Sequence, residues 1–163
     1  MRHVIVADEN DCRFLDPTAY LDLLPALAAD LPAGARAFAT EAGHYDFGSQ
    51  RCVKDLKPDT VLSGRTSGER WLELRFRHNC WKHEEDLAIR YSGVVDAFPA
   101  SSCRPPVWAE RNAITLDEIL PHEHGCRHEM CFDEGSLTVV SRDLTAVWTE
   151  AVCPDKPAPP GQT

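Results

Sequence analysis

The sequence predicts an α+β protein, mainly an antiparallel β-sheet in a sandwich-like arrangement, with one N-terminal helix. Two patterns support this prediction. Apolar residues recur at helical spacing between residues 16 and 31, and further along they alternate with polar residues over several short segments separated by turn-forming residues. One helix followed by many short strands with hairpin turns is typical of this fold class.

The helix is predicted within "LDPTAYLDLLPALAADL", residues 15–31. Asp16 suits the capping position, and Pro17 suits the first helical position, where its missing N–H costs nothing. Pro25 lacks the N–H that a helix interior uses, so we expect a kink or split there. The apolar stripe of this helix consists of Tyr20, Leu24, Leu27 and Leu31.

Strands are predicted where the apolar spacing changes to alternation. In residues 71–80, "WLELRFRHNC", one face consists of Leu72, Leu74, Phe76, His78 and Cys80. Further strand candidates are residues 34–40, 51–56, 86–95, 113–120, 127–132, 136–141 and 144–152. The tetrapeptide "DEGS" at 133–136 is typical of a hairpin turn between two of them.

The length of 163 residues suits a single domain, which we expect over residues 1–153. The Pro-rich residues 154–163 have little to bury and are expected to be disordered. No segment has the length of a membrane span or the apolar stretch of a signal peptide, which predicts a cytoplasmic protein without a membrane partner.

The net charge of −9 argues against nucleic acid as the main partner, because phosphate binding requires a cationic face. The same charge suits a soluble protein and can attract a basic protein partner. Seven cysteines are an odd number, which fits a closed disulfide framework poorly. We therefore expect reduced thiols or metal ligands.

Two segments concentrate the histidines and cysteines: residues 78–85, "HNCWKHEE", and residues 122–131, "HEHGCRHEMC". Zinc binds four imidazole or thiolate ligands, so these segments predict a site for zinc or another transition metal. A helical zinc motif is excluded, because Pro121 and Gly125 oppose a helix and no glutamate follows His124 in the required pattern. The candidate ligands are His78, Cys80, His83, His122, His124, Cys126 and His128.

The same residues have two other interpretations. The first is that they are strand-end and turn residues, with Met130 and Phe132 entering the core. The second is a catalytic thiolate, because Cys80 and Cys126 each lie between two histidines in the sequence. No nucleotide-binding glycine motif is present, so no nucleotide cofactor is expected.

A candidate partner-binding surface follows from the opposite face of residues 71–77. Trp71 lies there beside Arg75 and Arg77, and exposed tryptophan and arginine side chains are typical anchors of protein interfaces. The alternative is that Trp71 packs at a sheet edge.

The segments "LAIRYSGVVDAF", "ITLDEILP" and "RHEMCFDEGSLTVVSRDLTAVW" follow one another in the chain. In this order they resemble small β-rich bacterial proteins that include immunity proteins of polymorphic toxin systems, and the composition is similar to that of actinobacterial proteins. The matching stretches are residues 90–98 and 128–148. The resemblance implies a protein that binds a partner and has no activity of its own. It transfers no catalytic residue.

Three functions therefore stay open. The leading one is a small cytosolic binding protein without catalytic activity, of immunity type, that binds a protein partner. The alternative is a metal-binding protein or metalloenzyme that uses both His/Cys segments, and the third is a small enzyme with an activated cysteine. The sequence does not predict an oligomeric state.

Overall fold

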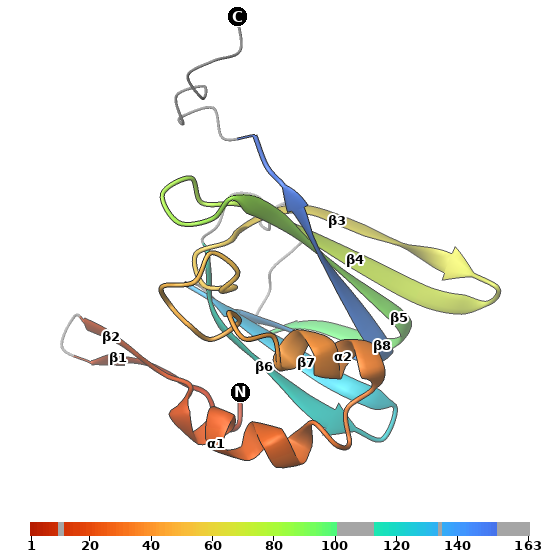
Figure 1. Cartoon of the computed structure of the whole chain (residues 1–163). Helices are drawn as coiled ribbons and strands as arrows, with labels where there is room; N and C mark the ends of the chain where they lie inside the picture. Colours follow the sequence, from red (N-terminus) through yellow and green to blue (C-terminus); the bar gives the residue numbers. More distant parts are fainter. Residues whose placement is uncertain (10–11, 101–112, 134, 153–163) are drawn as a thin grey trace, which may run out of the picture.

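A computed structural model describes residues 1–9, 12–100, 113–133 and 135–152 (Figure 1). Its centre is a six-stranded antiparallel sheet, which confirms the predicted fold class. In spatial order the strands are β3 (Lys57–Thr66), β4 (Glu69–Arg77), β5 (Glu85–Ala100), β8 (Ser136–Glu150), β7 (Gly125–Phe132) and β6 (Ile114–His122). The predicted tail at 154–163 lies outside the described residues.

The two longest strands, β5 and β8, bend and belong to both halves of the sheet (Figure 1). Gly93 has a φ of 61°, and a Cβ at this position would lie 2.9 Å from the Cβ of Arg142. A bulge follows between Val94 and Asp96. Bulges bend the strand that carries them, so β5 pairs with β4 before this point and only with β8 after it.

The two outer strands of the sheet meet at one end. Asp55 and Leu56, directly before β3, exchange two backbone hydrogen bonds of 2.8 Å with Ile114, the first residue of β6. The sheet therefore closes on itself at this end like a barrel, and side chains fill its interior. The core includes Leu74, Ile89, Leu116, Met130 and Val139, which come from five different strands.

Helix α1 (Thr18–Leu27) confirms the predicted apolar stripe, since Tyr20 and Leu24 are buried. Asp16 Oδ1 accepts a hydrogen bond of 2.8 Å from the amide of Thr18. Pro25 does not split the helix. It lies near the end of α1, where the loss of one backbone hydrogen bond costs less than in a long helix.

Residues 33–39 form a second helix, α2 (Ala33–Ala39), so the predicted strand at 34–40 is wrong. The physical reason lies on β8. The carboxylate of Asp143 accepts hydrogen bonds from the first amides of α2, those of Gly34 (3.1 Å) and Ala35 (2.9 Å). A cap supplied from a distant strand stabilises a short, alanine-rich helix that local spacing does not reveal.

Other boundaries also differ from the prediction. Strand β4 ends at Arg77, so residues 78–80 lie in a loop and not on the inward face. Residues 51–56 form turns and no strand. The two strands predicted at 136–141 and 144–152 are the single strand β8. The predicted hairpin at 133–136 is confirmed, because Cys131 pairs with Ser136.

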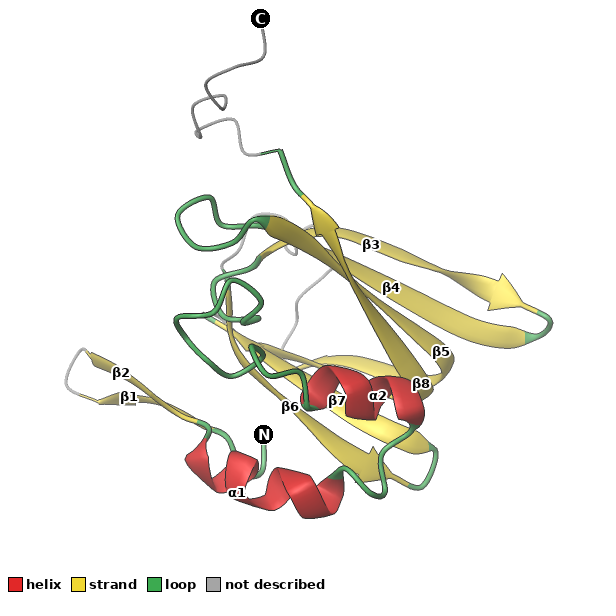
Figure 2. Cartoon of the chain, in the orientation of Figure 1, coloured by secondary structure: helices red, strands yellow, loops and turns green. Residues whose placement is uncertain are grey.

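Both helices pack at the same end of the sheet, α1 against β6 and α2 against β8 and β6 (Figure 2). Strand β6 is consequently buried from Ile114 to Leu120, on both of its faces. The outer face of β6 holds the N-terminal segment, because Glu118 accepts hydrogen bonds from the amides of Arg2 and Val4. A separate hairpin, β1 (Ile5–Glu9) and β2 (Cys12–Asp16), precedes α1. Neither described helix is both long and apolar enough to traverse a lipid bilayer.

Candidate interaction site

The first His/Cys segment forms a loop between β4 and β5. Both the amide and Nδ1 of His78 lie 2.7 Å from Asp86 Oδ1, and Nε2 of His78 lies 3.4 Å from the sulfur of Cys80. Cys80 is disulfide-bonded, which corrects for this residue the expectation of a reduced thiol or metal ligand, whereas Cys52, Cys126 and Cys131 are free thiols as expected. A metal ligand or a nucleophile requires a free thiolate.

His83 faces inward and is fully buried. Its Nε2 donates to the carbonyl of Cys52 (2.9 Å), and its Nδ1 accepts from the amide of Asn79 (3.1 Å). Burial lowers the pKa of His83, and the bond from an amide N–H to Nδ1 also requires the neutral ring. Both ring nitrogens therefore form hydrogen bonds with the backbone, and neither is available to bind a metal ion.

The second segment turns between β6 and β7. His122 and His124 flank the tip with ring centroids 5.4 Å apart, and His122 Nδ1 accepts from the amide of His124. Gly125 has a φ of 124° and lies against the carbonyl of Arg142, where a side chain has no room. This confirms the interpretation of a polar turn that leads into a strand. Met130 and Phe132 further along β7 are buried, as predicted.

Cys126 points into the core on β7. Its sulfur lies 3.6 Å from Ser141 Oγ, and burial raises its pKa to about 11. A thiol with this pKa is protonated near neutral pH and is a poor nucleophile. Within the described parts of the chain, no group of three or more His, Cys, Asp or Glu side chains is arranged to hold a metal ion.

One predicted ligand, His128, belongs instead to a buried cluster, which we call the polar cluster: His44, Tyr91, Asp117 and His128. Nε2 of His44 lies 2.8 and 2.9 Å from the two carboxylate oxygens of Asp117, and Nε2 of His128 lies 2.9 Å from Oδ2. Tyr91 Oη lies 2.7 Å from His128 Nδ1. All four side chains are at most 1% exposed.

Asp117 is the acceptor at the centre of the polar cluster. Burial alone raises the pKa of a carboxyl group, but the attraction of His44 and the hydrogen bonds from His128 and His44 outweigh it. They hold the pKa of Asp117 well below its usual range. The phenol of Tyr91 has its pKa raised by burial and by Asp117, so it stays a donor toward His128. The cluster orients its members and presents none of them to solvent.

The sequence prediction missed Asp117 and His44. A signal for Asp117 was present, since Asp117 and Glu118 interrupt an apolar run at 113–120. Charged residues are rarely buried without partners. An acidic pair between isoleucines and leucines therefore indicates that each carboxylate has hydrogen-bond or ion-pair partners inside the protein. His44 lies in a loop, and no spacing in the sequence connects it to β6.

The other candidate is the face of the sheet that points away from the core, which we call the open face. Cross-strand pairing places its residues side by side on four strands. They are Thr60, Leu62 and Gly64 of β3, Trp71, Glu73, Arg75 and Arg77 of β4, Ala88, Arg90 and Ser92 of β5, and Thr145 and Val147 of β8. None of them is buried. This arrangement includes the three predicted partner-binding residues.

Trp71 is held on the open face by its neighbours on both sides. The guanidinium carbon of Arg90 lies 4.1 Å from the centroid of the indole ring, a cation–π contact. Gly64 on β3 gives the ring its space, because a Cβ there would lie 2.7 Å from the indole Cζ2. The ring is therefore half-buried and fixed in orientation, which lowers the entropy cost of binding against it.

The arginines of the open face are held by carboxylates. Glu73 accepts from Arg75 (2.8 Å) and from Arg90 (3.1 Å), and Arg77 lies 3.4 Å from Asp59. The hydrogen bond from Arg75 is the main reason that the pKa of Glu73 is lowered. The side chains of Arg75 and Arg77 are still 54% and 60% exposed. Part of each guanidinium therefore stays available to a partner.

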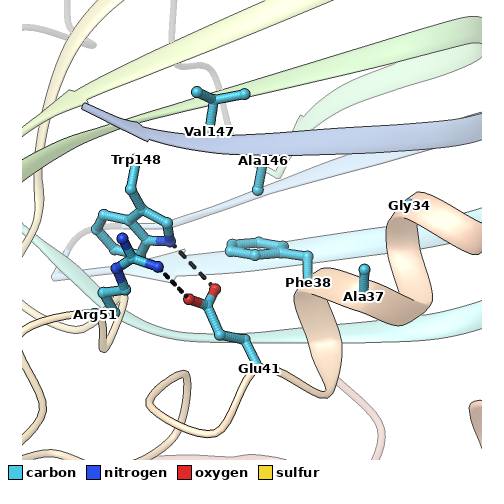
Figure 3. Close-up of a pocket in the computed structure, with 8 residues that line it drawn as sticks. All are labelled: Gly34, Ala37, Phe38, Glu41, Arg51, Ala146, Val147 and Trp148. Carbon is cyan, nitrogen blue, oxygen red and sulfur yellow. Dashed lines mark hydrogen bonds and ion pairs between the residues drawn. The ribbon is translucent and has the colours of Figure 1, made fainter.

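A pocket of about 370 Å³ lies between α2 and β8 (Figure 3). Glu41 accepts from Trp148 Nε1 (3.2 Å) and from Arg51 (3.3 Å), and Arg51 also forms a two-bond ion pair with Glu85. The ring of Phe38 extends from α2 toward Trp148 and lies beneath Ala146, as Figure 3 shows. The polar groups at its mouth bind one another, so the geometry favours a crevice bridged by an ion-pair network.

Neither a protein-family model, nor a curated protein, nor a solved structure matches this chain.

Proposed function

We propose that this chain is a protein-binding domain without catalytic activity, and that the open face is its recognition surface. The observation that carries the proposal is the fixed indole of Trp71 within a four-stranded sheet face that no described helix or strand covers. Interface anchors are typically tryptophan and arginine side chains that are rigid before binding. The open face combines both, with the exposed Leu62 and Val147 as additional apolar contacts.

The interior supports the same proposal. The polar cluster has the residue types of a catalytic site, yet all of its members are buried in the core and joined by hydrogen bonds through Asp117 and His128. Cys80 is disulfide-bonded, and the pKa of Cys126 is raised. Neither cysteine offers the thiolate that an activated nucleophile needs.

The resemblance of residues 90–98 and 128–148 to immunity-type proteins suggests which kind of partner to seek. Those residues lie on β5, β7 and β8, and both β5 and β8 contribute to the open face. The proposed partner is a protein toxin whose activity this chain blocks by binding.

Affinity capture followed by mass spectrometry tests the proposal, with binding then measured on the purified partner by calorimetry. We expect Trp71→Ala, and separately the double variant Arg75→Ala/Arg77→Ala, to weaken binding at least about tenfold. Asp22→Ala/Leu23→Ala on the exposed side of α1 is the matched control and should bind like the unmodified protein. Equal binding by all variants would remove the open face as the recognition surface.

A cell assay tests the immunity part separately. The captured partner is expressed alone and together with this chain, and growth is recorded. Growth restored by the unmodified protein and not by Trp71→Ala supports an immunity role. A partner that binds through the open face but harms no cell would leave a binding protein of another kind.

Elemental analysis of the purified protein separates this proposal from the predicted metal site. Structural zinc sites hold one ion per site and contribute directly to folding. We expect less than about a tenth of an equivalent of zinc, copper, iron or nickel, and no change in circular dichroism with chelator. One equivalent of metal would favour the metalloprotein instead.

A further inference from the structure

The far end of the β3–β4 hairpin carries two arginines that face each other. Arg65 and Arg70 are directly opposite in the cross-strand register, and like charges in this position destabilise a hairpin. Arg65 Nη1 donates to the carbonyl of Gly68 (3.2 Å), and Arg70 Nη1 donates to the carbonyl of Val95 (3.3 Å). Across the described part of the chain, neither forms an ion pair with a carboxylate.

Neighbouring arginines are treated differently. Arg75, Arg77, Arg90 and Arg142 each have a carboxylate partner. The arginines elsewhere on this sheet thus have carboxylate partners, whereas the two at the hairpin tip donate only to backbone carbonyls. A local arrangement that costs stability is often retained for function.

The alternation of the strands places these two side chains on the core-facing side. Leu72 and the buried Leu74 follow Arg70 at two and four positions along β4, on the same side of the strand. Further out the core ends, because the last β4–β5 pair is Trp71 with Ser92 and β5 then turns away at the Gly93 bend. The hairpin therefore projects with its inner face open.

A depression of about 240 Å³ lies in the angle between the projecting hairpin and the bend of β5. Leu72, Val94 and Ala97 form its apolar part, and Arg65 and Arg70 line it from the hairpin. The rest of its lining is Ser63, Gly64 and Trp71. We call it the arginine pocket. The turn at Ser67 and Gly68, both with positive φ, holds the two strands in register and so fixes both arginines.

We propose that the arginine pocket binds an acidic side chain of the protein partner, with an apolar side chain beside it. Two guanidinium groups match the geometry of a carboxylate, and the apolar part suits a neighbouring leucine or similar residue. The pocket has room for one or two side chains. A nucleic acid is disfavoured by the net charge of −9. This inference rests on the proposed function and adds the chemistry of one contact to it.

Titration of ¹⁵N-labelled protein with a blocked Leu–Glu–Leu tripeptide, followed by NMR, tests the pocket without the partner. We expect the amide signals of Arg65, Arg70, Leu72 and Ala97 to shift. The matched Leu–Gln–Leu peptide should bind about tenfold more weakly, because it lacks the charge. Equal binding of the two peptides, or binding of neither, overturns the proposal. Inorganic phosphate that competes fully would show a general anion site and also overturn it.

Variants locate the effect. Arg70→Glu creates an oppositely charged pair with Arg65, so we expect a higher melting temperature together with loss of peptide binding. A structural role for Arg70 predicts the reverse, a lower melting temperature. Arg36→Gln on α2, an exposed arginine whose side chain donates to the carbonyl of Leu31, is the control and should leave peptide binding unchanged.

The same variants separate this inference from the proposed function. A captured partner that depends on Arg75 and Arg77 but not on Arg65 and Arg70 keeps the proposed function and removes the pocket. Peptide binding by the pocket without any captured partner does the opposite. Concentration-dependent dimerisation that is abolished by Arg70→Glu would identify a second copy of this chain as the occupant and would overturn the proposal.

Discussion

The polar cluster and the open face are both built around a carboxylate that accepts from two side chains, but one lies in the core and the other at the surface. In the polar cluster, Asp117 accepts from two imidazoles and no member reaches solvent. On the open face, Glu73 accepts from two arginines, yet both guanidinium groups stay about half exposed. A carboxylate shared by two hydrogen-bond donors therefore stabilises the fold where it is buried and prepares a recognition surface where it is not.

Removing the acceptor of the polar cluster should have the largest effect. Asp117→Asn places an amide between two buried imidazoles and removes the charge that both of them face. We expect the free energy of unfolding to fall by about 3–5 kcal/mol, the range for breaking a buried charge pair, as measured by urea denaturation. Asp22→Asn on the surface of α1 is the control and should change it by less than about 0.5 kcal/mol. A loss below about 1 kcal/mol for Asp117→Asn would show that the cluster contributes little.

Acid should weaken the polar cluster through the protonation of Asp117. The folded pKa of Asp117 lies below its ordinary value of 3.8, so the stability it contributes is complete above that pH. The contribution is lost as the pH falls from that value through the folded pKa. The unfolding curves of the unmodified protein and of Asp117→Asn, measured between about pH 5 and about pH 2, should therefore converge as the pH falls. Curves that stay parallel would contradict the assignment.

A smaller pH effect is expected from His83. Burial lowers the folded pKa of His83, so the unfolded chain binds a proton below the ordinary value of 6.5 while the folded chain stays neutral. Stability is unaffected above that pH and decreases as the pH falls below it. His83→Gln should remove this part of the slope, which denaturation at several pH values between about 7 and 5 measures. An unchanged slope would show that His83 takes up its proton in the folded state.

The smallest effect on stability should come from the open face. Arg75→Gln/Arg77→Gln breaks two exposed ion pairs, which contribute about 0–1 kcal/mol each, so we expect a change of about 2 kcal/mol at most. Added salt should reduce the difference further. A loss comparable to that of Asp117→Asn would erase the contrast between the two regions. It would indicate that these arginines support the fold.

How much of this could be predicted varies with the range of the interaction. Alternation identified β4, β5, β6 and β7 and placed Trp71, Arg75 and Arg77 on the outer face, because each of these follows from neighbours along one strand. Helix α2 was missed because its capping carboxylate, Asp143, comes from β8. The end of β4 was misplaced because the loop at 78–84 is held by Asp86 and Cys52.

The candidate sites show the same division. The two His/Cys segments were recognised because they contain many histidines within a few positions. That number does not determine the direction in which each imidazole ring points. His128 turns inward to Asp117, while His124 stays in the turn. The arginine pocket requires the bend of β5, which depends on one glycine and a bulge. No pattern in the sequence of β3 or β4 contains that bend.

The bend in β5 has a consequence for how the chain folds. Hairpins β3–β4 and β6–β7 close over turns of two residues, whereas β5 and β8 pair Ala100 with Ser136 and Glu85 with Glu150. The longest ladder of the protein thus joins distant parts of the chain, and closing such loops is slow. Both halves of the barrel depend on it, so neither is complete until that ladder forms. We expect refolding on the millisecond to second scale. The local hairpins should form first, and the slower pairing of β5 with β8 should complete the sheet.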